Sequence, residues 1–216
     1  MFRINQPGFI INSPPILNKP EISAQTKVFR QKPEIVDEVL KWENNGKKSS
    51  KKQPKWNISR FPLSCYIEDE PSQGFNKAVN ISFKSWSDIT GGLLDFKKAY
   101  SIDNADIVVS WTDEKFPGRE YEAGSNDLKV VNNKIEKAFI TIIIFPAIDA
   151  GLSSDARVER VRRTALHEIG HAMGLDHSNN PKDIMFHRGI VNKNLSSSDI
   201  QRLMEHYQKN SLDIIT

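Results

Sequence analysis

Residues 164–177 read Thr-Ala-Leu-His-Glu-Ile-Gly-His-Ala-Met-Gly-Leu-Asp-His, and the rest of the chain is best interpreted outward from this stretch. It holds three of the protein's five histidines. His167 and His171 are four residues apart, so on an α-helix they lie one turn apart on the same face. Gly174 is the residue type that ends a helix in a left-handed turn. Such a turn brings His177 back towards the other two, so the spacing predicts that three imidazoles meet.

Three imidazoles that meet at one point are typical ligands of a zinc ion. Three protein ligands leave a fourth position open, as in catalytic zinc sites and unlike structural ones. Glu168 directly follows the first ligand, where its carboxylate can reach a metal-bound water. The stretch therefore predicts one zinc per chain, held by His167, His171 and His177, with Glu168 as the general base.

The length and composition suit one folded domain with an extension. The chain has 216 residues and a formal net charge of +3, so charge alone indicates no nucleic-acid partner. Its longest apolar run, 139–145, is strand-sized, and no run is long enough for a transmembrane helix. The first residues lack the apolar core of a secretory signal, so the default expectation is a cytoplasmic monomer, with non-classical export as the alternative. Cys65 is the only cysteine, so no internal disulfide forms.

Residues 1–56 are interpreted as a Pro- and Lys-rich N-terminal tail. This stretch is poor in apolar residues, and six of the prolines fall within it. A short helix is predicted at 33–42, where a partial apolar face follows Pro33. The basic run 47–55 is typical of a solvated linker, with binding to an anionic partner as the alternative. The tail is also a candidate pro-segment.

Residues 57–216 are predicted to form one α+β domain. Strands are expected at 61–68, 93–99, 105–111, 121–131 and 135–145, and a helix at 72–88 packs on the sheet. The run 139–145 is apolar on both faces, which indicates an interior strand. The polar arm 121–131 indicates an edge strand, to which an extended peptide could add. Ala123 and Gly124 are therefore candidate substrate-binding residues.

Two further helices are expected, at 155–173 and 197–208. The second has Ser196 as N-cap and Asp199 placed for a capping box. His206 within it is expected to be exposed. The four arginines of 157–163 are expected on a solvated face, because basic residues near a helix start need exposure or carboxylate partners. Cys65 is expected to be a small buried side chain, with a zinc-binding thiol switch as the alternative.

The zinc stretch resembles the signature of the metzincin zinc peptidases, and within them of the matrixins. The signature matches at His167, Glu168, His171, Gly174 and His177. Ser178 after the third histidine is the matrixin variant, and Met185 stands where the family's Met-turn methionine lies. The resemblance covers about 57–209. It implies a zincin fold, with a twisted mixed five-stranded sheet, an antiparallel edge strand, an active-site helix and a C-terminal helix. It also implies a zinc-dependent endopeptidase acting on peptides or proteins.

The chain departs from the matrixin pattern in three ways. Residues 1–56 contain no cysteine that could plug the zinc, and no histidine precedes His167 to hold a second, structural zinc. Phe186 replaces the tyrosine that often follows the Met-turn methionine. The chain therefore resembles small microbial relatives of the matrixins more than the secreted animal enzymes. Calcium at Asp103 and Asp106 is conceivable, but no specific motif supports it.

Two open questions concern the pocket and the function. His187, in the predicted pocket wall 186–191, is a candidate substrate contact, with a solvated loop as the alternative. The alternative function is a non-catalytic, zinc-stabilised binding protein of the same fold. Glu168 favours the enzyme, because a purely structural site has no use for that carboxylate.

Overall fold

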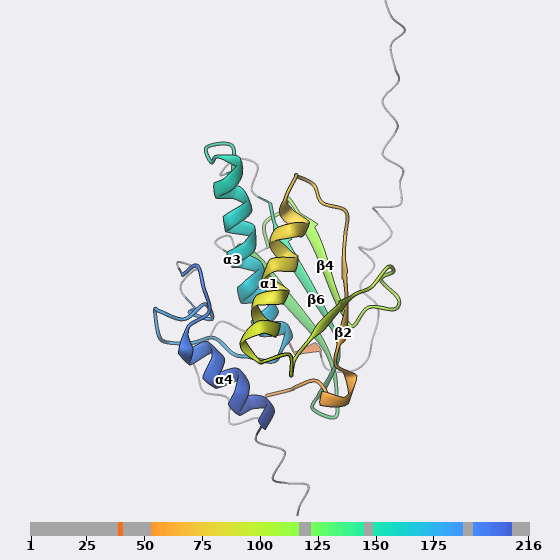
Figure 1. Ribbon diagram of the computed structural model, residues 1–216. Helices are drawn as coiled ribbons and strands as arrows, with labels where there is room; N and C mark the ends of the chain where they lie inside the picture. The colour runs from red at the N-terminus through yellow and green to blue at the C-terminus, as the bar shows by residue number, and fades with distance from the viewer. Residues whose placement is uncertain (1–38, 41–52, 117–121, 145–148, 188–191, 209–216) are drawn as a thin grey trace, which may run out of the picture. The chain divides into compact units, whose positions relative to one another are not determined.

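The computed structural model describes residues 39–40, 53–116, 122–144, 149–187 and 192–208. All of them belong to the unit of the chain that begins at Asp37. Figure 1 shows two long helices, α1 and α3, side by side in front of a sheet, with a third helix, α4, below α3. This arrangement confirms the predicted α+β class.

Six strands form one mixed sheet, in the order β1-β5-β6-β4-β2-β3. The strands are β1 Val39–Leu40, β2 Leu63–Ile67, β3 Phe96–Lys98, β4 Ile107–Thr112, β5 Gly124–Val131 and β6 Lys134–Ile143. β3, β2, β4 and β6 run parallel, whereas β5 is antiparallel to β6 and β1 is antiparallel to β5. The five predicted strands all form, and the mixed sheet with an antiparallel β5 is confirmed.

The two-residue strand β1 contradicts the helix that the sequence predicted over 33–42. Val39–Leu40 pair with Leu128–Lys129 of β5, and the other residues of that predicted helix lie outside the described chain. A few adjacent apolar residues suit either structure, and an open sheet edge offers backbone hydrogen bonds to an extended segment. Among the described strands, β1 covers the outer edge of β5 at Leu128–Lys129, and Gly124–Asp127 have no partner strand on that side.

The β5–β6 hairpin turns at Asn132 and Asn133, between the predicted strands 121–131 and 135–145. Both residues have positive φ, 49° and 60°, as a two-residue type I′ turn requires. Asparagine tolerates this left-handed conformation better than most residues. The turn fixes the register in which β5 lies beside β6.

The helices are α1 Phe75–Ile89, α3 Ser154–Ala172 and α4 Ser197–Gln208, and Ile58–Arg60 form one turn of 3₁₀ helix. α1 buries the face that the sequence predicted. Two of its side chains bond to backbone carbonyls of α3: Trp86 Nε1 donates to Leu166 O at 3.0 Å, and Ser82 Oγ donates to Arg162 O at 2.9 Å. α1 therefore fixes α3 just before its histidines.

The helices leave part of the other sheet face open. In β6, Ile140 and Ile142 are at most 1% exposed, whereas Phe139, on the opposite face of the strand, is 40% exposed. The predicted interior position of β6 is confirmed, because it lies between β5 and β4. The sequence suggested that side chains on both faces of this strand are interior. This was wrong for the face that carries Phe139, because successive side chains of a strand point to opposite faces.

The arginines at the start of α3 are not a simple solvated face. Arg160 donates through Nε and Nη2 to the carboxylate of Asp149, at 3.0 and 2.7 Å, and Asp149 is only 3% exposed. Arg162 pairs in the same way with Glu159 one turn earlier, at 2.8 and 2.9 Å. Carboxylate partners offset the unfavourable helix dipole, so these side chains are half-buried and not fully solvated.

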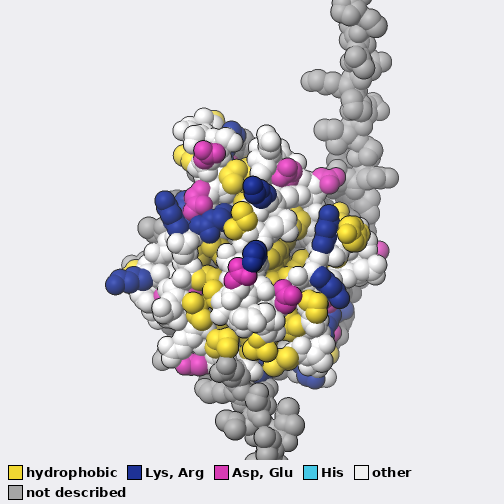
Figure 2. All heavy atoms as spheres, in the orientation of Figure 1, with side chains coloured by type: hydrophobic (Ala, Val, Ile, Leu, Met, Phe, Trp, Pro, Cys, Tyr) yellow, Lys and Arg dark blue, Asp and Glu magenta, His cyan; other side chains and the backbone are white. Residues whose placement is uncertain are grey.

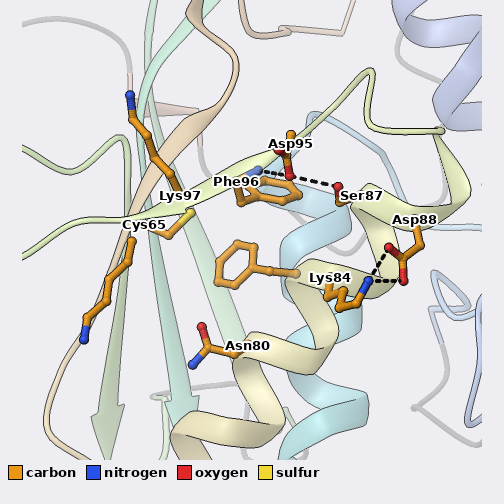
Figure 3. A pocket seen from close by; sticks show the side chains of 10 residues that line it. Cys65, Asn80, Lys84, Ser87, Asp88, Asp95, Phe96 and Lys97 are labelled. Carbon is orange, nitrogen blue, oxygen red and sulfur yellow. Dashed lines mark hydrogen bonds and ion pairs between the residues drawn. The ribbon is translucent and has the colours of Figure 1, made fainter.

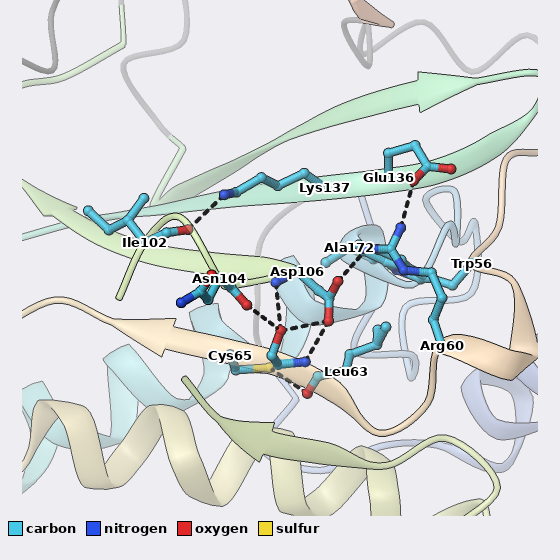
Figure 4. Close-up of polar contacts among 11 residues, drawn as sticks. Trp56, Arg60, Leu63, Cys65, Ile102, Asn104, Asp106, Glu136, Lys137 and Ala172 are labelled. Atoms are coloured by element: carbon cyan, nitrogen blue, oxygen red, sulfur yellow. Dashed lines mark hydrogen bonds and ion pairs between the residues drawn. The ribbon is translucent and has the colours of Figure 1, made fainter. Parts of the chain in front are cut away.

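A second carboxylate network joins the start of the domain to the sheet (Figure 4). Asp106, before β4, accepts hydrogen bonds from Ser64 N and Ser64 Oγ, both at 2.7 Å, and pairs with Arg60. Arg60 also pairs with Glu136 of β6 at 2.7 Å. The cationic partner of Asp106 is thus an arginine of the same chain.

The visible surface mixes charges of both signs. Figure 2 shows Lys, Arg, Asp and Glu side chains interspersed with hydrophobic ones on the face that carries α1. Among the described residues, no helix combines the length and the apolar character needed to cross a membrane.

Residues Gln53–Trp56, here called the N-terminal strap, lie against the domain although the sequence assigned them to the tail. Trp56 is 1% exposed and donates from Nε1 to Ala172 O, at the end of α3, at 2.8 Å. Its backbone N–H is 3.4 Å from the hydroxyl of Tyr207 in α4. The strap therefore joins the ends of α3 and α4.

His206 is half-buried under this strap, which corrects the prediction that it is exposed. Its Nε2 lies 3.2 Å from Pro54 O. The pKa of His206 is lowered to about 4, chiefly by burial; the nearby Lys55 acts in the same direction, and the Pro54 carbonyl opposes both. The polar neighbours of His206 in the sequence suggested exposure, because they gave no sign that the strap covers this helix.

Trp56→Ala should lower the free energy of unfolding by about 3–5 kcal/mol, the usual cost of deleting a buried aromatic side chain. Urea unfolding of the full chain measures it. Trp56→Phe should cost less, because it keeps the ring and loses mainly the bond to Ala172. Ile58→Ala, at a 41% exposed position, is the control and should change stability by no more than about 0.5 kcal/mol. Equal midpoints for Trp56→Ala and the control would contradict the burial of the strap.

Stability of the zinc-free protein should fall as the pH drops from about 6.5 to about 4, partly through His206. The folded pKa lies below the ordinary value of 6.5, so the unfolded chain takes up the proton first and acid favours unfolding in this window. His206→Gln removes the titrating group. Its unfolding free energy should therefore decline less than that of the wild type between pH 7 and pH 4.5. An identical decline would count against the prediction.

Candidate metal centre

The three histidines of the zinc stretch meet as the sequence predicts. Nε2 of His167 is 3.1 Å from Nε2 of His171, and Nε2 of His177 is 3.2 Å from each of them. Two come from α3, and the third follows Gly174, whose φ of +88° turns the chain back. Among the described residues, this is the one cluster of three or more potential metal ligands.

The donor set fits a zinc ion. His167 Nδ1 faces Ile184 O and His171 Nδ1 faces Leu175 O, both at 2.7 Å. A carbonyl only accepts, so in each neutral ring Nδ1 carries the hydrogen and Nε2 offers a lone pair. Such lone pairs repel at this range unless a cation lies between them. Tetrahedral ligands with Zn–N bonds of about 2.0–2.1 Å stand roughly 3.3 Å apart, close to the observed spacing.

The surroundings keep the imidazoles in the neutral form that binds metal. Burial lowers the pKa of His167 and, together with the neighbouring histidines, lowers the pKa of His171 well below its ordinary value. Burial also lowers the pKa of His177 to about 4, aided by the charges of His167, His187 and Arg202. A metal therefore meets little competition from protons at neutral pH.

Glu168 lies between α3 and the start of β5. It is 5% exposed, and a Cβ added to Gly124 would stand 2.8 Å from its Oε1 and 2.8 Å from Thr164 Cγ2. Only glycine therefore lets the strand come this close to the carboxylate. The fold thus brings Gly124 and Glu168 together, although they are far apart in the sequence. Ala123, the other candidate residue, is half-buried, and its carbonyl accepts from Ile143 N at 2.9 Å.

Asn126 of β5 also reaches α3, and the sequence gave no sign of it beyond its place in the edge strand. Its Nδ2 donates to the backbone carbonyl of Glu168 at 3.2 Å. The side chain is 9% exposed, and within the described chain its buried Oδ1 has no hydrogen-bond partner. The strand is thus attached to the helix at Glu168.

Met185 lies beneath the histidines, against the helix backbone between them. It is fully buried, and a Cβ added to Gly170 would stand 2.3 Å from its Sδ. Gly170 lies between His167 and His171 in the sequence, and its lack of a side chain leaves room for this sulfur. This contact lies next to His171 in the helix, and the Met-turn role of Met185 stays a prediction.

The segment after Met185 returns to the third histidine. Ser178 N donates to Met185 O at 2.6 Å, and His187 N donates to Ser178 O at 3.3 Å. The ring of His187 is exposed, with Nδ1 3.2 Å from Ser178 O and the Phe186 ring beside it. The rest of the predicted pocket wall, 188–191, lies outside the described residues.

Two buried aspartates organise this segment, and sequence reasoning recognised only one of them, as a helix cap. Asp183 is 1% exposed and accepts from four side chains, those of Ser178, Asn180, Ser196 and Ser198. Asp199 is fully buried; it accepts from Ser196 N at 3.0 Å, while Asp199 N donates to Ser196 Oγ at 2.9 Å, which confirms the capping box. The hydroxyl and amide residues around Asp183 were the available signal.

Asp199 does more than cap α4. It also accepts from Ile184 N at 2.8 Å and from Met185 N at 3.3 Å. The carbonyl of the same Ile184 fixes the His167 ring. A chain of hydrogen bonds therefore runs from α4 through one peptide unit to the first metal ligand, an outer-shell arrangement common around protein metals.

Cys65 lies apart from the histidine cluster. It lines a cavity of about 320 Å³ between α1 and β3, with Lys84, Asp88 and Lys97 at its rim (Figure 3). The thiol is buried, and burial together with the charge of Asp106 raises its pKa. A protonated thiol is a poor metal ligand, which favours the predicted role as a small buried side chain over a thiol switch.

The sequence profile and the known proteins that this chain matches point to one family. The sequence profile of the matrixin family matches residues 48–208. The chain is 28% identical over 163 residues to the macrophage metalloelastase of Oryctolagus cuniculus, which covers 68% of this chain and 32% of that protein. It is 28% identical over 151 residues to matrix metalloproteinase-B of Caenorhabditis elegans, covering 58% of this chain and 29% of that protein.

Two further similarities reach beyond animals. Metalloendoproteinase 2-MMP of Arabidopsis thaliana is 25% identical over 169 residues, covering 73% of this chain and 44% of that protein. The chain thus spans less than half the length of the curated relatives it matches. Among solved structures, the archaemetzincin of Methanopyrus kandleri aligns with a TM-score of 0.45 and 19% identity, covering 68% of this chain and 94% of that one.

Asp199→Asn should destabilise the zinc-free protein by about 1–3 kcal/mol, because an amide cannot replace both acceptor oxygens and leaves a buried backbone N–H unpaired. Denaturant unfolding of zinc-free protein measures the change. Asp155→Asn, at an exposed position in the first turn of α3, should have at most a small effect. Matching stabilities for the two variants would show that the Asp199 bonds do not hold this segment.

Proposed function

Since this chain belongs to the matrixin family, we propose that it is a zinc-dependent endopeptidase that hydrolyses peptide bonds with Glu168 as the general base. The observation that carries the proposal is the convergence of three neutral imidazole nitrogens directly beside a buried glutamate. His167, His171 and His177 would hold a single zinc ion and leave one coordination position for the reaction.

Zinc bound there would supply a Lewis acid that lowers the pKa of a coordinated water and polarises the substrate carbonyl. Glu168 takes a proton from the attacking water and delivers it to the leaving amine nitrogen. The backbone of Gly124 limits where this carboxylate can go, because even a Cβ there would stand only 2.8 Å from Glu168 Oε1. This confinement supports a fixed orientation towards the metal, which general base catalysis requires.

Gly124–Asp127 of β5, which have no outer partner among the described strands, are the proposed binding edge for an extended peptide. Ile143 N donates to Ala123 O, so these two residues form a hydrogen-bonded pair of the antiparallel ladder. In such a ladder alternate residues point their N–H and C=O groups the other way, which directs those of Gly124 and Asn126 outward. A substrate adding there as a strand would place a peptide bond beside Glu168. Ala123 and Gly124 are the proposed substrate-binding residues.

His187 is the third proposed substrate contact. Its exposed ring is attached to the loop of the third ligand through Ser178 O, so it borders the metal centre. Phe186 beside it has no hydroxyl, so the stabilisation of negative charge on the substrate oxygen would fall to the metal. The physiological substrates would be peptides or proteins.

Glu168→Ala should leave one zinc per chain and lower the rate of peptide cleavage at least about 100-fold, the usual contribution of a general base. Zinc content by atomic spectroscopy and cleavage of a fluorogenic peptide library measure the two effects. Glu159→Gln, on the same helix but paired with Arg162, is the matched control and should keep wild-type activity.

The same assay separates the alternative, a non-catalytic binding protein that uses zinc only for stability. Full-length wild type should cleave the library with zinc, stop on addition of a chelator, and recover when zinc returns. A wild type that binds zinc but cleaves nothing would overturn the peptidase proposal in favour of the alternative. Cleavage that survives in Glu168→Ala would overturn the role of the glutamate.

A further inference from the structure

Arg202, in the second turn of α4, contacts the backbone of the third metal ligand. Its Nη2 donates to Asp176 O at 2.6 Å and lies 3.3 Å from His177 O. Within the described chain these two carbonyls are its only side-chain hydrogen-bond partners, because its Nη1 is buried without one. The guanidinium is therefore held at the loop of His177, where the carboxylates of Asp176 and Asp183 also interact with its charge.

His177 depends on its backbone for orientation more than the other two ligands do. His167 and His171 belong to α3, and each ring is fixed by a hydrogen bond from Nδ1 to a carbonyl. The ring of His177, among the described residues, has hydrogen-bond distances only to the Nε2 atoms of those two histidines. It also stands in a loop outside any helix or strand. Its ring position is set by how its loop is held.

The positive charge of Arg202 opposes zinc binding, whereas its hydrogen bonds to the His177 loop favour it. The guanidinium is bonded to the backbone of His177 itself, so its positive charge lies close to the metal ligands. A positive charge at that place repels Zn²⁺ as well as a proton. Holding the loop should strengthen zinc binding, and the charge alone should weaken it. The two effects have opposite signs, so variants can separate them.

We propose that Arg202 is a positioning residue for the third zinc ligand: by holding the carbonyls of Asp176 and His177 it keeps the His177 ring at the metal, and this outweighs its repulsion of the ion. The inference rests on the zinc site of the proposed function. It assigns to α4 a direct part in metal affinity, in addition to the bonds of Asp199.

Zinc affinity of the full chain, measured with Zn²⁺ alone against a chromogenic chelator at pH 7, tests the proposal. Arg202→Lys keeps the charge and loses the fork that reaches both carbonyls, whereas Arg202→Gln loses the charge as well. Both should raise the zinc dissociation constant about tenfold, the lower end of the usual effect of outer-shell partners. Arg162→Gln is the matched control: this half-buried arginine also donates to a backbone carbonyl, that of Lys193, and should leave zinc affinity unchanged.

The melting temperature of the zinc-free proteins separates positioning from a general loss of stability. Arg202→Lys should lower it no more than the control does, while its zinc affinity falls. If Arg202→Gln does not fold, Arg202→Lys decides alone. Zinc binding at wild-type affinity in a folded Arg202 variant, or tighter binding in Arg202→Gln, would overturn the proposal and leave the peptidase function intact. A wild type that does not bind zinc would instead contradict the proposed function.

Discussion

The end of α3 at Gly174 is the constraint on which the metal centre depends. Two ligands must lie on the last two turns of the helix, and the third must return to them within six residues. A helix that stops there leaves its last carbonyls without intrahelical partners. Leu175 N fills one by bonding to Gly170 O at 3.0 Å, in the pattern of a left-handed helix end. The remaining carbonyls have to be satisfied from elsewhere in the chain.

Two distant segments supply those partners. Trp56 of the N-terminal strap donates to Ala172 O, and the hydroxyl of Tyr207 in α4 donates to Met173 O at 3.0 Å. Pro54 O lies so close to Gly174 that a Cβ there would meet it at 2.1 Å. Gly174 is thus needed twice, for its positive φ and for the room it leaves. The strap and α4 are therefore structural supports of the turn that carries His177.

The histidines and Glu168 are held in place by different parts of the structure. The rings of His167 and His171 are fixed by carbonyls, one of them in the segment that Asp199 holds. Glu168 is instead confined from the sheet side by Gly124, while Asn126 attaches that strand to the carbonyl of the same glutamate. The strand proposed to bind substrate and the residue proposed to move protons are thus parts of one contact. In the proposed mechanism, such a contact would keep the peptide bond of a substrate aligned with the carboxylate.

The sequence by itself determined the local chemistry: the helical spacing of His167 and His171, the break at Gly174, the capping box at Asp199, and five of the six strands of the sheet. These follow from short-range periodicity and residue type, which a single sequence displays. Only the tertiary structure decided which residues support the site. Trp56, Asn126 and Arg202 act through contacts between segments distant in the chain, and His206 is half-buried by the N-terminal strap. Burial and pairing of that kind depend on how the elements pack, which no local pattern encodes.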